Sequence, residues 1–134
     1  MKKSIINILF IAAFGLILMI AVQCTKKAAT VEDAVKNYYS SINKNNYKSS
    51  NPDMISGWAE KNDMDKQYLE EFQGTIAEIF KQHQGLKEVK VISNNPGSTA
   101  QQAILNVELV CNDGYTEAVM QQLVMEEETW KIVQ

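Results

Sequence analysis

The chain has 134 residues, with 13 lysines, no arginine and 16 acidic residues, which give a formal net charge of −3 at pH 7. Nucleic-acid recognition depends on a positive surface and on bidentate guanidinium contacts, so we expect no nucleic-acid partner. With one histidine and two cysteines, the chain lacks the ligands of a transition-metal site, and its four glycines after residue 70 stand too far apart for a phosphate loop. We therefore predict no metal and no cofactor.

The N-terminal segment has the pattern of a secretory signal or a membrane-spanning helix. Lys2 and Lys3 are followed by an apolar run, residues 5–22, that only Asn7 interrupts. As a helix, the run would be about 27 Å long, which is barely the thickness of the hydrocarbon core of a bilayer. Lysines flank both ends of the run and give no firm orientation, which weakens the interpretation as a membrane anchor.

The end of the run resembles the lipobox of bacterial lipoproteins, a Leu-Ala-Gly-Cys-like tetrapeptide, here Ala21-Val22-Gln23-Cys24. In that family the signal is removed and the cysteine becomes the lipidated N-terminus. The resemblance implies a signal peptide over residues 1–23, lipidation of Cys24, a tether over residues 24–29 and an exported bacterial protein held at a membrane of the cell envelope. Two residues depart from the pattern, since Ala21 replaces the usual large aliphatic residue and Gln23 the usual small one. An uncleaved membrane anchor and another processing route are therefore the alternatives.

The rest of the chain is long enough for one domain. Without residues 1–23 it has 111 residues, with 11 lysines against 16 acids and a formal charge of −5. We place the domain at residues 30–134, and a domain of this size needs no disulfide bond for stability. We expect Cys111 to be a small buried apolar residue at the end of a strand rather than a reactive thiol.

Three helices are predicted before any strand. Thr30 is suited to cap the first, which ends in the polar run 43–46. Asn51-Pro52-Asp53 predicts the start of a short second helix. The third is predicted to begin near Asp65 and to stop at Gly85, with Met64 and Leu69 as a hydrophobic staple. The predicted apolar stripes are Val31, Ala34, Val35, Tyr38, Tyr39 and Ile42 on the first helix, and Leu69, Phe72, Ile76, Ile79 and Phe80 on the third.

After Gly85 the apolar residues alternate with a period of two, which predicts strands. Turns at residues 94–97, 112–114 and 127–128 separate them, and Asp113-Gly114 suits a hairpin because glycine adopts positive φ readily. The predicted strands are residues 86–93, 103–111, 116–126 and 129–133. The sequence therefore predicts an α+β domain in which three helices pack on a four-stranded antiparallel sheet.

This order resembles the nuclear-transport-factor-2-like superfamily, whose members fold as a cystatin-like cone in which a curved sheet wraps around a long helix. More narrowly, the chain is similar to small bacterial lipoproteins of unknown function in that superfamily, some of them called lumazine-binding-like. The resemblance covers about residues 30–134 and implies a fold and a pocket, not an activity. It is carried by Val35-x-x-Tyr38-Tyr39-x-x-Ile42, Asn46-Tyr47-Lys48, Leu86-Lys87-Glu88-Val89-Lys90-Val91 and Trp130-Lys131-Ile132.

Aromatic residues are the candidate ligand contacts. Tyr38, Tyr39, Trp58 and Phe80 can line the open end of a cone, although core packing is the ordinary role of aromatic residues at helical spacing. Adjacent tyrosines point about 100° apart on a helix, so at least one hydroxyl needs water, a protein partner or a ligand.

No catalytic residue is predicted. His83 is the only histidine, and its place near the end of the third helix favours an interaction with the terminal carbonyls over catalysis. Asn62-Asp63-x-Asp65 has some oxygen ligands of a calcium loop but lacks the loop glycine and the distal glutamate, so a helix cap is the better interpretation.

The sequence favours a lipid-anchored, non-catalytic binding module for a small apolar ligand or an envelope protein. One alternative is an enzyme of the same fold with an acid or base in the pocket. Another is a structural or inhibitory domain that uses a polar sheet face. That face would include Gln101, Asn106, Glu108, Gln121 and Gln122.

Overall fold

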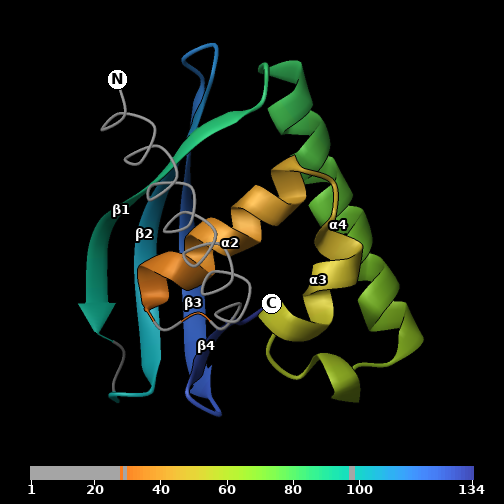
Figure 1. Ribbon diagram of the computed structural model, residues 1–134, viewed down its shortest axis with the longest axis vertical. Helices are drawn as coiled ribbons and strands as arrows, with labels where there is room; N and C mark the ends of the chain where they lie inside the picture. Colours follow the sequence, from red (N-terminus) through yellow and green to blue (C-terminus); the bar gives the residue numbers. More distant parts are fainter. Residues whose placement is uncertain (1–27, 29, 97–98) are drawn as a thin grey trace, which may run out of the picture.

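The computed structural model describes Ala28 and residues 30–96 and 99–134, so Cys24 and the predicted signal lie outside the described residues. Within them, three helices precede four strands, as predicted (Figure 1). None of the helices in these ranges combines the length and the apolar character that a membrane span needs. The elements are α2 (Val31–Asn43), α3 (Tyr47–Met54), a short 3-10 helix η1 (Trp58–Glu60), α4 (Asp63–Gln82), β1 (Leu86–Pro96), β2 (Gln102–Cys111), β3 (Thr116–Glu126) and β4 (Thr129–Ile132).

Helix α2 forms as the sequence predicts. The hydroxyl oxygen of Thr30 accepts a hydrogen bond from the N–H of Asp33 at 3.1 Å, which satisfies one of the free donors of the first turn. Glu32 and Asp33 place negative charge where the helix dipole favours it. All six apolar residues of the predicted stripe are buried, so α2 is the central helix of the core.

The predicted start of the second helix is wrong. Helix α3 begins at Tyr47 rather than after Asn51, and Pro52 lies inside it. Asn51 caps nothing, because its side chain is fully buried and bonded to Gln73 on α4. This long-range amide pair has no signature in the local sequence.

Helix α4 begins earlier than predicted. Asn62 is its N-cap and accepts a hydrogen bond from the N–H of Asp65 at 2.8 Å, which confirms a capping role for this acidic stretch. Met64 therefore lies within the helix and is 80% exposed, so the predicted staple with Leu69 does not form. Gly85, with φ of +91°, ends the helix as predicted, and its N–H donates to the carbonyl of Phe80 at 2.7 Å.

The four strands form one antiparallel sheet in the order β1-β2-β3-β4. The predicted inward face of β2 is confirmed, since Leu105, Val107, Leu109 and Cys111 are buried together with Ala103. Across the sheet, the same layer continues through Leu123 on β3 and Ile132 on β4, which are paired with each other. These residues and the stripe of α2 form most of the core.

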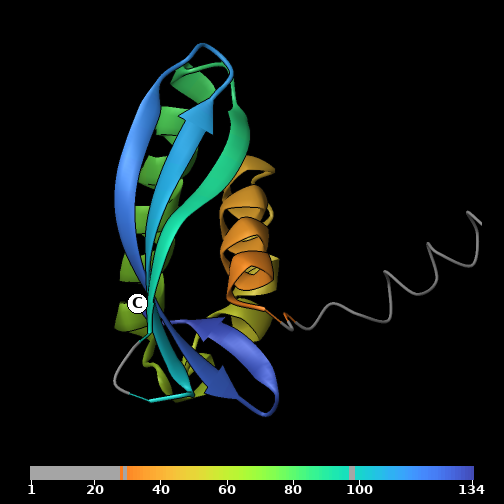
Figure 2. The same ribbon diagram turned by 90° about the vertical axis from the view of Figure 1, so that its left-hand side faces the viewer.

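Helix α2 lies between the sheet and the pair formed by α3 and α4 (Figure 1). It contacts α3, α4, β1 and β4, so every layer of the domain packs on it. The sheet curves strongly along its strands, and all the helices lie on its concave side (Figure 2). The architecture is thus a helical layer held inside a curved sheet.

The outer edge of β4 is closed by other parts of the chain. The N–H of Trp130 donates to the carbonyl of Ala28 at 3.0 Å, and the N–H of Ser56 donates to the carbonyl of Ile132 at 2.8 Å. Ile55 forms a parallel bridge with Ile132. Ala28 therefore already belongs to the folded domain.

The outer edge of β1 is protected differently. The strand is irregular between Leu86 and Glu88 and again between Val91 and Ser93, and irregular, charged edge strands resist pairing with another chain. A shallow hollow of about 660 Å³ separates this edge from α2. We therefore expect no strand addition at β1.

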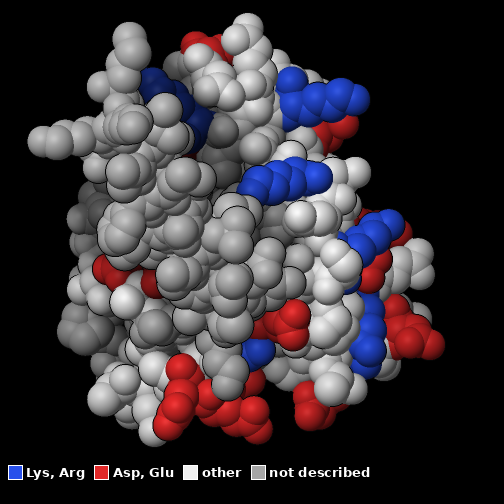
Figure 3. Space-filling model, viewed as in Figure 1, with Lys and Arg blue, Asp and Glu red and all other residues white. Residues whose placement is uncertain are grey.

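Lysines and acidic residues are interspersed on the helical side of the described surface shown in Figure 3, and this view shows no continuous positive patch among the described residues. Carboxylates gather at its lower end, where the β3–β4 hairpin lies (Figure 3). The hairpin carries Glu126, Glu127 and Glu128.

Candidate functional site

The predicted aromatic contacts belong mainly to the core. Tyr38, Tyr39 and Phe80 are at most 4% exposed, and Tyr38 packs edge-on against Tyr39 with 4.9 Å between ring centres. Trp58 is half-buried on η1, with the amino group of Lys66 5.5 Å from its ring centre. None of these four aromatic residues lines the hollow between β1 and α2 or the cavity of about 470 Å³ that lies between α2, α3 and α4. Their role as ligand contacts stays a prediction.

A buried amide pair accounts for the hydroxyl of Tyr38. The side chains of Asn51 and Gln73 exchange two hydrogen bonds, at 2.8 and 2.7 Å, and both side chains are fully buried. Gln73 also donates to the Tyr38 hydroxyl oxygen at 3.5 Å. The network joins α2, α3 and α4 through polar groups that have no access to water.

A second polar pair accounts for the hydroxyl of Tyr39, which donates to Oε1 of Gln121 at 3.0 Å. Gln121 is 2% exposed and faces the helices, so the interpretation of this residue as part of an outer polar face is wrong. Its partner across the strands is Leu105, a residue of the buried layer. Both tyrosines have therefore found protein partners.

Both tyrosines stay neutral around physiological pH. Burial raises the pKa of Tyr38 to about 12, against a smaller lowering by the hydrogen bond with Gln73. Burial, and then the proximity of Tyr38, raises the pKa of Tyr39 well above its usual value. The two hydroxyls therefore serve as hydrogen-bonding groups and not as acids or bases.

His83 clamps the end of α4 to the β2–β3 turn. It is the C-cap residue of α4, as its predicted position requires, but its ring binds a carboxylate instead of helix carbonyls. Nδ1 of His83 lies 2.8 Å from Oδ2 of Asp113, and the ring stacks on Tyr115 with 3.8 Å between centres. Hydrogen bonds from the Tyr115 N–H and from His83 hold the pKa of Asp113 below its usual range. The cluster joins a helix end to a turn, and its residues line neither of the two cavities named above.

Cys111 is buried as predicted, with 1% of its surface exposed. Burial, reinforced by the charge of Asp113, raises the pKa of its thiol, so the reactive thiolate is disfavoured. In the described ranges, no three metal-ligating side chains come together.

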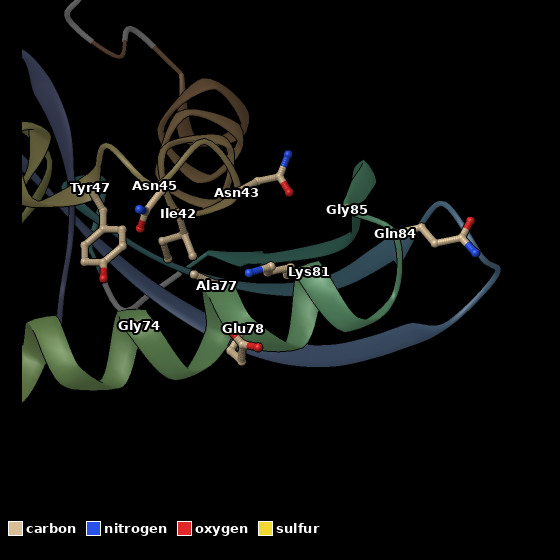
Figure 4. Close-up of a pocket in the computed structure, with 10 residues that line it drawn as sticks. All are labelled: Ile42, Asn43, Asn45, Tyr47, Gly74, Ala77, Glu78, Lys81, Gln84 and Gly85. Atoms are coloured by element: carbon tan, nitrogen blue, oxygen red, sulfur yellow. The ribbon is translucent and has the colours of Figure 1, made fainter.

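The candidate site is a cavity of about 470 Å³ where the end of α2 and the start of α3 face the second half of α4 (Figure 4). Ile42 and Ala77 give it apolar walls, Tyr47 closes one end, and Lys81 lies toward the other. Its volume is in the range of small-molecule sites, about 300 to 1,000 Å³. The full lining is Ile42, Asn43, Asn45, Tyr47, Gly74, Ala77, Glu78, Lys81, Gln84 and Gly85.

Two backbone features shape this cavity. Asn45 and Gln84 have φ of +60° and +66°, in the left-handed region that asparagine tolerates and that strains glutamine. Asn45 lies in the middle of the α2–α3 connection, and Gln84 lies in the turn that brings the chain from α4 into β1. Both residues belong to the lining of the cavity.

Sequence reasoning missed this cavity, although one signal was present. Gly74 lies in the middle of α4, where glycine costs about 1 kcal/mol relative to alanine. The structure shows what stands beside it: a Cβ at Gly74 would lie 3.3 Å from the hydroxyl oxygen of Tyr47. The glycine therefore leaves space for that hydroxyl at the cavity wall.

Comparison with known proteins supports the fold. No protein-family model matches the chain, and no curated protein matches it. A crystal structure from Campylobacter jejuni, provisionally described as an NTF2-like transpeptidase, superposes with a TM-score of 0.62 and 17% sequence identity. The match covers 77% of this chain and 96% of that chain.

The chain has the nuclear-transport-factor-2-like fold. At 17% identity the likeness extends to the fold alone, so the activity named for the Campylobacter protein is not carried over. In this chain, the buried hydroxyls of Tyr38 and Tyr39 are bonded to glutamines, and a cavity of about 470 Å³ lies between α2, α3 and α4.

Proposed function

We propose that the protein is a bacterial cell-envelope lipoprotein, whose nuclear-transport-factor-2-like domain hangs from a lipid on Cys24 and serves as a non-catalytic binding module. The position of Ala28 supports this proposal, because its carbonyl is bonded to β4. Four peptide units separate Cys24 from Ala28, which span about 14 Å at full extension. The anchor would hold the domain within this short distance of the bilayer.

The cavity between α2 and α4 is the observation that carries the binding role. Its size suits a small molecule, and Ile42 and Ala77 give it apolar walls, while polar side chains make up most of the rest of its lining. The proposed occupant is a small molecule with an apolar part, and an envelope protein bound elsewhere on the domain is the second form of the proposal. Tethering raises the local concentration of such a module at the membrane.

An enzyme of the same fold is the alternative, and one observation favours it. Glu78 lines the cavity and could act as an acid or base. Its side chain is exposed, and in Figure 4 it points away from Ile42 and Tyr47. A carboxylate that faces water and points away from the apolar wall is poorly placed to exchange a proton with a molecule bound in the cavity, so binding is the better proposal.

The anchor can be tested by labelling. Replacing Cys24 with Ser should abolish the incorporation of an alkyne-tagged fatty acid in the host, because the thiol that carries the lipid is gone. Cys111→Ala is the matched control, since it removes the other cysteine, which is buried, and should leave labelling unchanged. Labelling that persists in the Cys24→Ser variant would refute the anchor.

The binding role can be tested by native mass spectrometry of the lipidated full chain purified from its own host. We expect a population heavier than the lipidated chain by the mass of one small molecule, released by denaturation. A chain that always has its bare lipidated mass would count against a bound ligand. If the released molecule is added back to the protein and its mass then changes, the protein has modified it, and this result would favour the enzyme.

A further inference from the structure

Lys81 supplies positive charge to the cavity between α2 and α4. Its side chain reaches back along α4 toward Ala77, beneath Ile42 (Figure 4). Among the described residues, no carboxylate forms an ion pair with its amino group. A lysine in the last turn of a helix commonly complements the helix dipole, but that role does not require the amino group to turn into a cavity.

Tyr47 supplies a hydroxyl to the other end of the cavity. The residue is 6% exposed, and its hydroxyl has no hydrogen-bond partner in the described part of the chain. Since no fully buried side-chain oxygen or nitrogen there lacks a partner, this hydroxyl is reached by solvent from the cavity. Gly74 keeps the space beside it open, because a Cβ at that position would approach the oxygen to 3.3 Å.

The surroundings favour a singly charged ligand over phosphate. The chain has no arginine, and the cavity meets the C-terminal half of α4, where the helix dipole is negative. Glu78 adds a nearby negative charge. Phosphate sites usually have a helix N-terminus or several guanidinium donors, whereas one carboxylate needs only one ammonium partner.

We infer that the cavity binds a small free monocarboxylate, with its carboxylate at the amino group of Lys81 and an apolar chain that passes Ile42 and Ala77 toward the hydroxyl of Tyr47. This inference rests on the proposed binding function and names the ligand class of the same cavity. A polar group at the far end of the ligand would meet the Tyr47 hydroxyl.

The test uses the lipidated full chain in a non-ionic detergent and three small probes. 6-Hydroxyhexanoate has both polar ends, hexanoate lacks the hydroxyl, and 6-hydroxyhexanamide lacks the charge. Binding is followed by the NMR shifts of the amides of Gly74, Ala77 and Gly85. We expect saturable shifts with both acids. The amide should bind at least about tenfold more weakly, because a charge-assisted hydrogen bond is lost.

Matched variants assign each contact. Lys81→Met keeps the aliphatic stem and should reduce acid binding about tenfold, whereas Lys87→Met removes an exposed charge outside the cavity and should change nothing. Tyr47→Phe should weaken 6-hydroxyhexanoate about threefold and leave hexanoate unchanged. Gly74→Ala should weaken 6-hydroxyhexanoate by crowding the hydroxyl, although alanine favours the helix.

Three results would overturn the inference: equal binding of the acid and the amide, full acid binding by Lys81→Met, or no shift at these amides with tens of millimolar of any probe. Tighter binding of phosphate, or of the peptide acid acetyl-triglycine, than of both acids would also overturn the proposal that the ligand is a free monocarboxylate. The proposed function is tested separately, because fatty-acid labelling and the co-purified mass do not depend on the charge of the ligand.

Discussion

Replacing Gln73 with Met should destabilise the domain by about 2 to 4 kcal/mol, a large share of the stability of a domain of this size. Methionine matches glutamine in length, so the change removes hydrogen bonds with little change of shape. It leaves the buried amide of Asn51 without its two hydrogen bonds to Gln73, which are 2.8 and 2.7 Å long. Urea unfolding of the full chain, followed by tryptophan fluorescence, would measure the loss.

A double-mutant cycle separates an unpaired amide from a packing defect. If the cost comes from the orphaned Asn51, then Asn51→Leu combined with Gln73→Met should recover more than half of the stability lost in Gln73→Met alone. Adding Tyr38→Phe should recover more, since it removes the hydroxyl that Gln73 contacts at 3.5 Å. A double variant less stable than either single variant would contradict this explanation.

The elements that the sequence predicted well are those whose signal is local and periodic. The stripe of α2 repeats at helical spacing and the inward face of β2 alternates over five residues, so each pattern has one solution that buries apolar surface. The helix cap at Thr30 and the stop at Gly85 depend on residues within one turn. For this reason the fold class was accessible from sequence.

The errors arise where a distant residue decides the outcome. Phe72 is 48% exposed although it is the more apolar residue, whereas its neighbour Gln73 is fully buried. The inner face of α4 accepts Gln73 because Asn51, twenty-two positions earlier, satisfies its amide. Gln121 is buried for the same reason, through Tyr39. A ranking by hydrophobicity cannot anticipate polar residues that are buried in pairs.

The cavity was inaccessible for a similar reason. Its lining comes from the end of α2, the start of α3 and the second half of α4, which meet only after the helices pack. Gly74 was visible in the sequence as a weak point of a helix, but the hydroxyl that it accommodates belongs to Tyr47, twenty-seven positions earlier. The prediction of Cys24 as a lipidation site falls outside the described residues and keeps its own test.

Replacing Glu127-Glu128 with Asn-Gly should stabilise the domain by about 1 to 2 kcal/mol. Both glutamates have positive φ, +50° and +65°, so they form the two central residues of a type I′ hairpin turn between β3 and β4. Residues other than glycine and asparagine pay roughly 1 kcal/mol each for this left-handed conformation. Asparagine and glycine adopt it readily, and the urea midpoint should rise at an unchanged m-value.

Charge repulsion is a competing explanation, since Glu126 precedes the turn and three carboxylates follow one another along the chain. The variant Glu127→Gln/Glu128→Gln removes two charges and keeps two side chains that disfavour positive φ. It should gain less than about 0.5 kcal/mol, and any gain from relieved repulsion should disappear in high salt. The gain from Asn-Gly should persist in salt, because backbone conformation is not screened. Equal stabilisation by the two variants would assign the strain to charge and not to the turn.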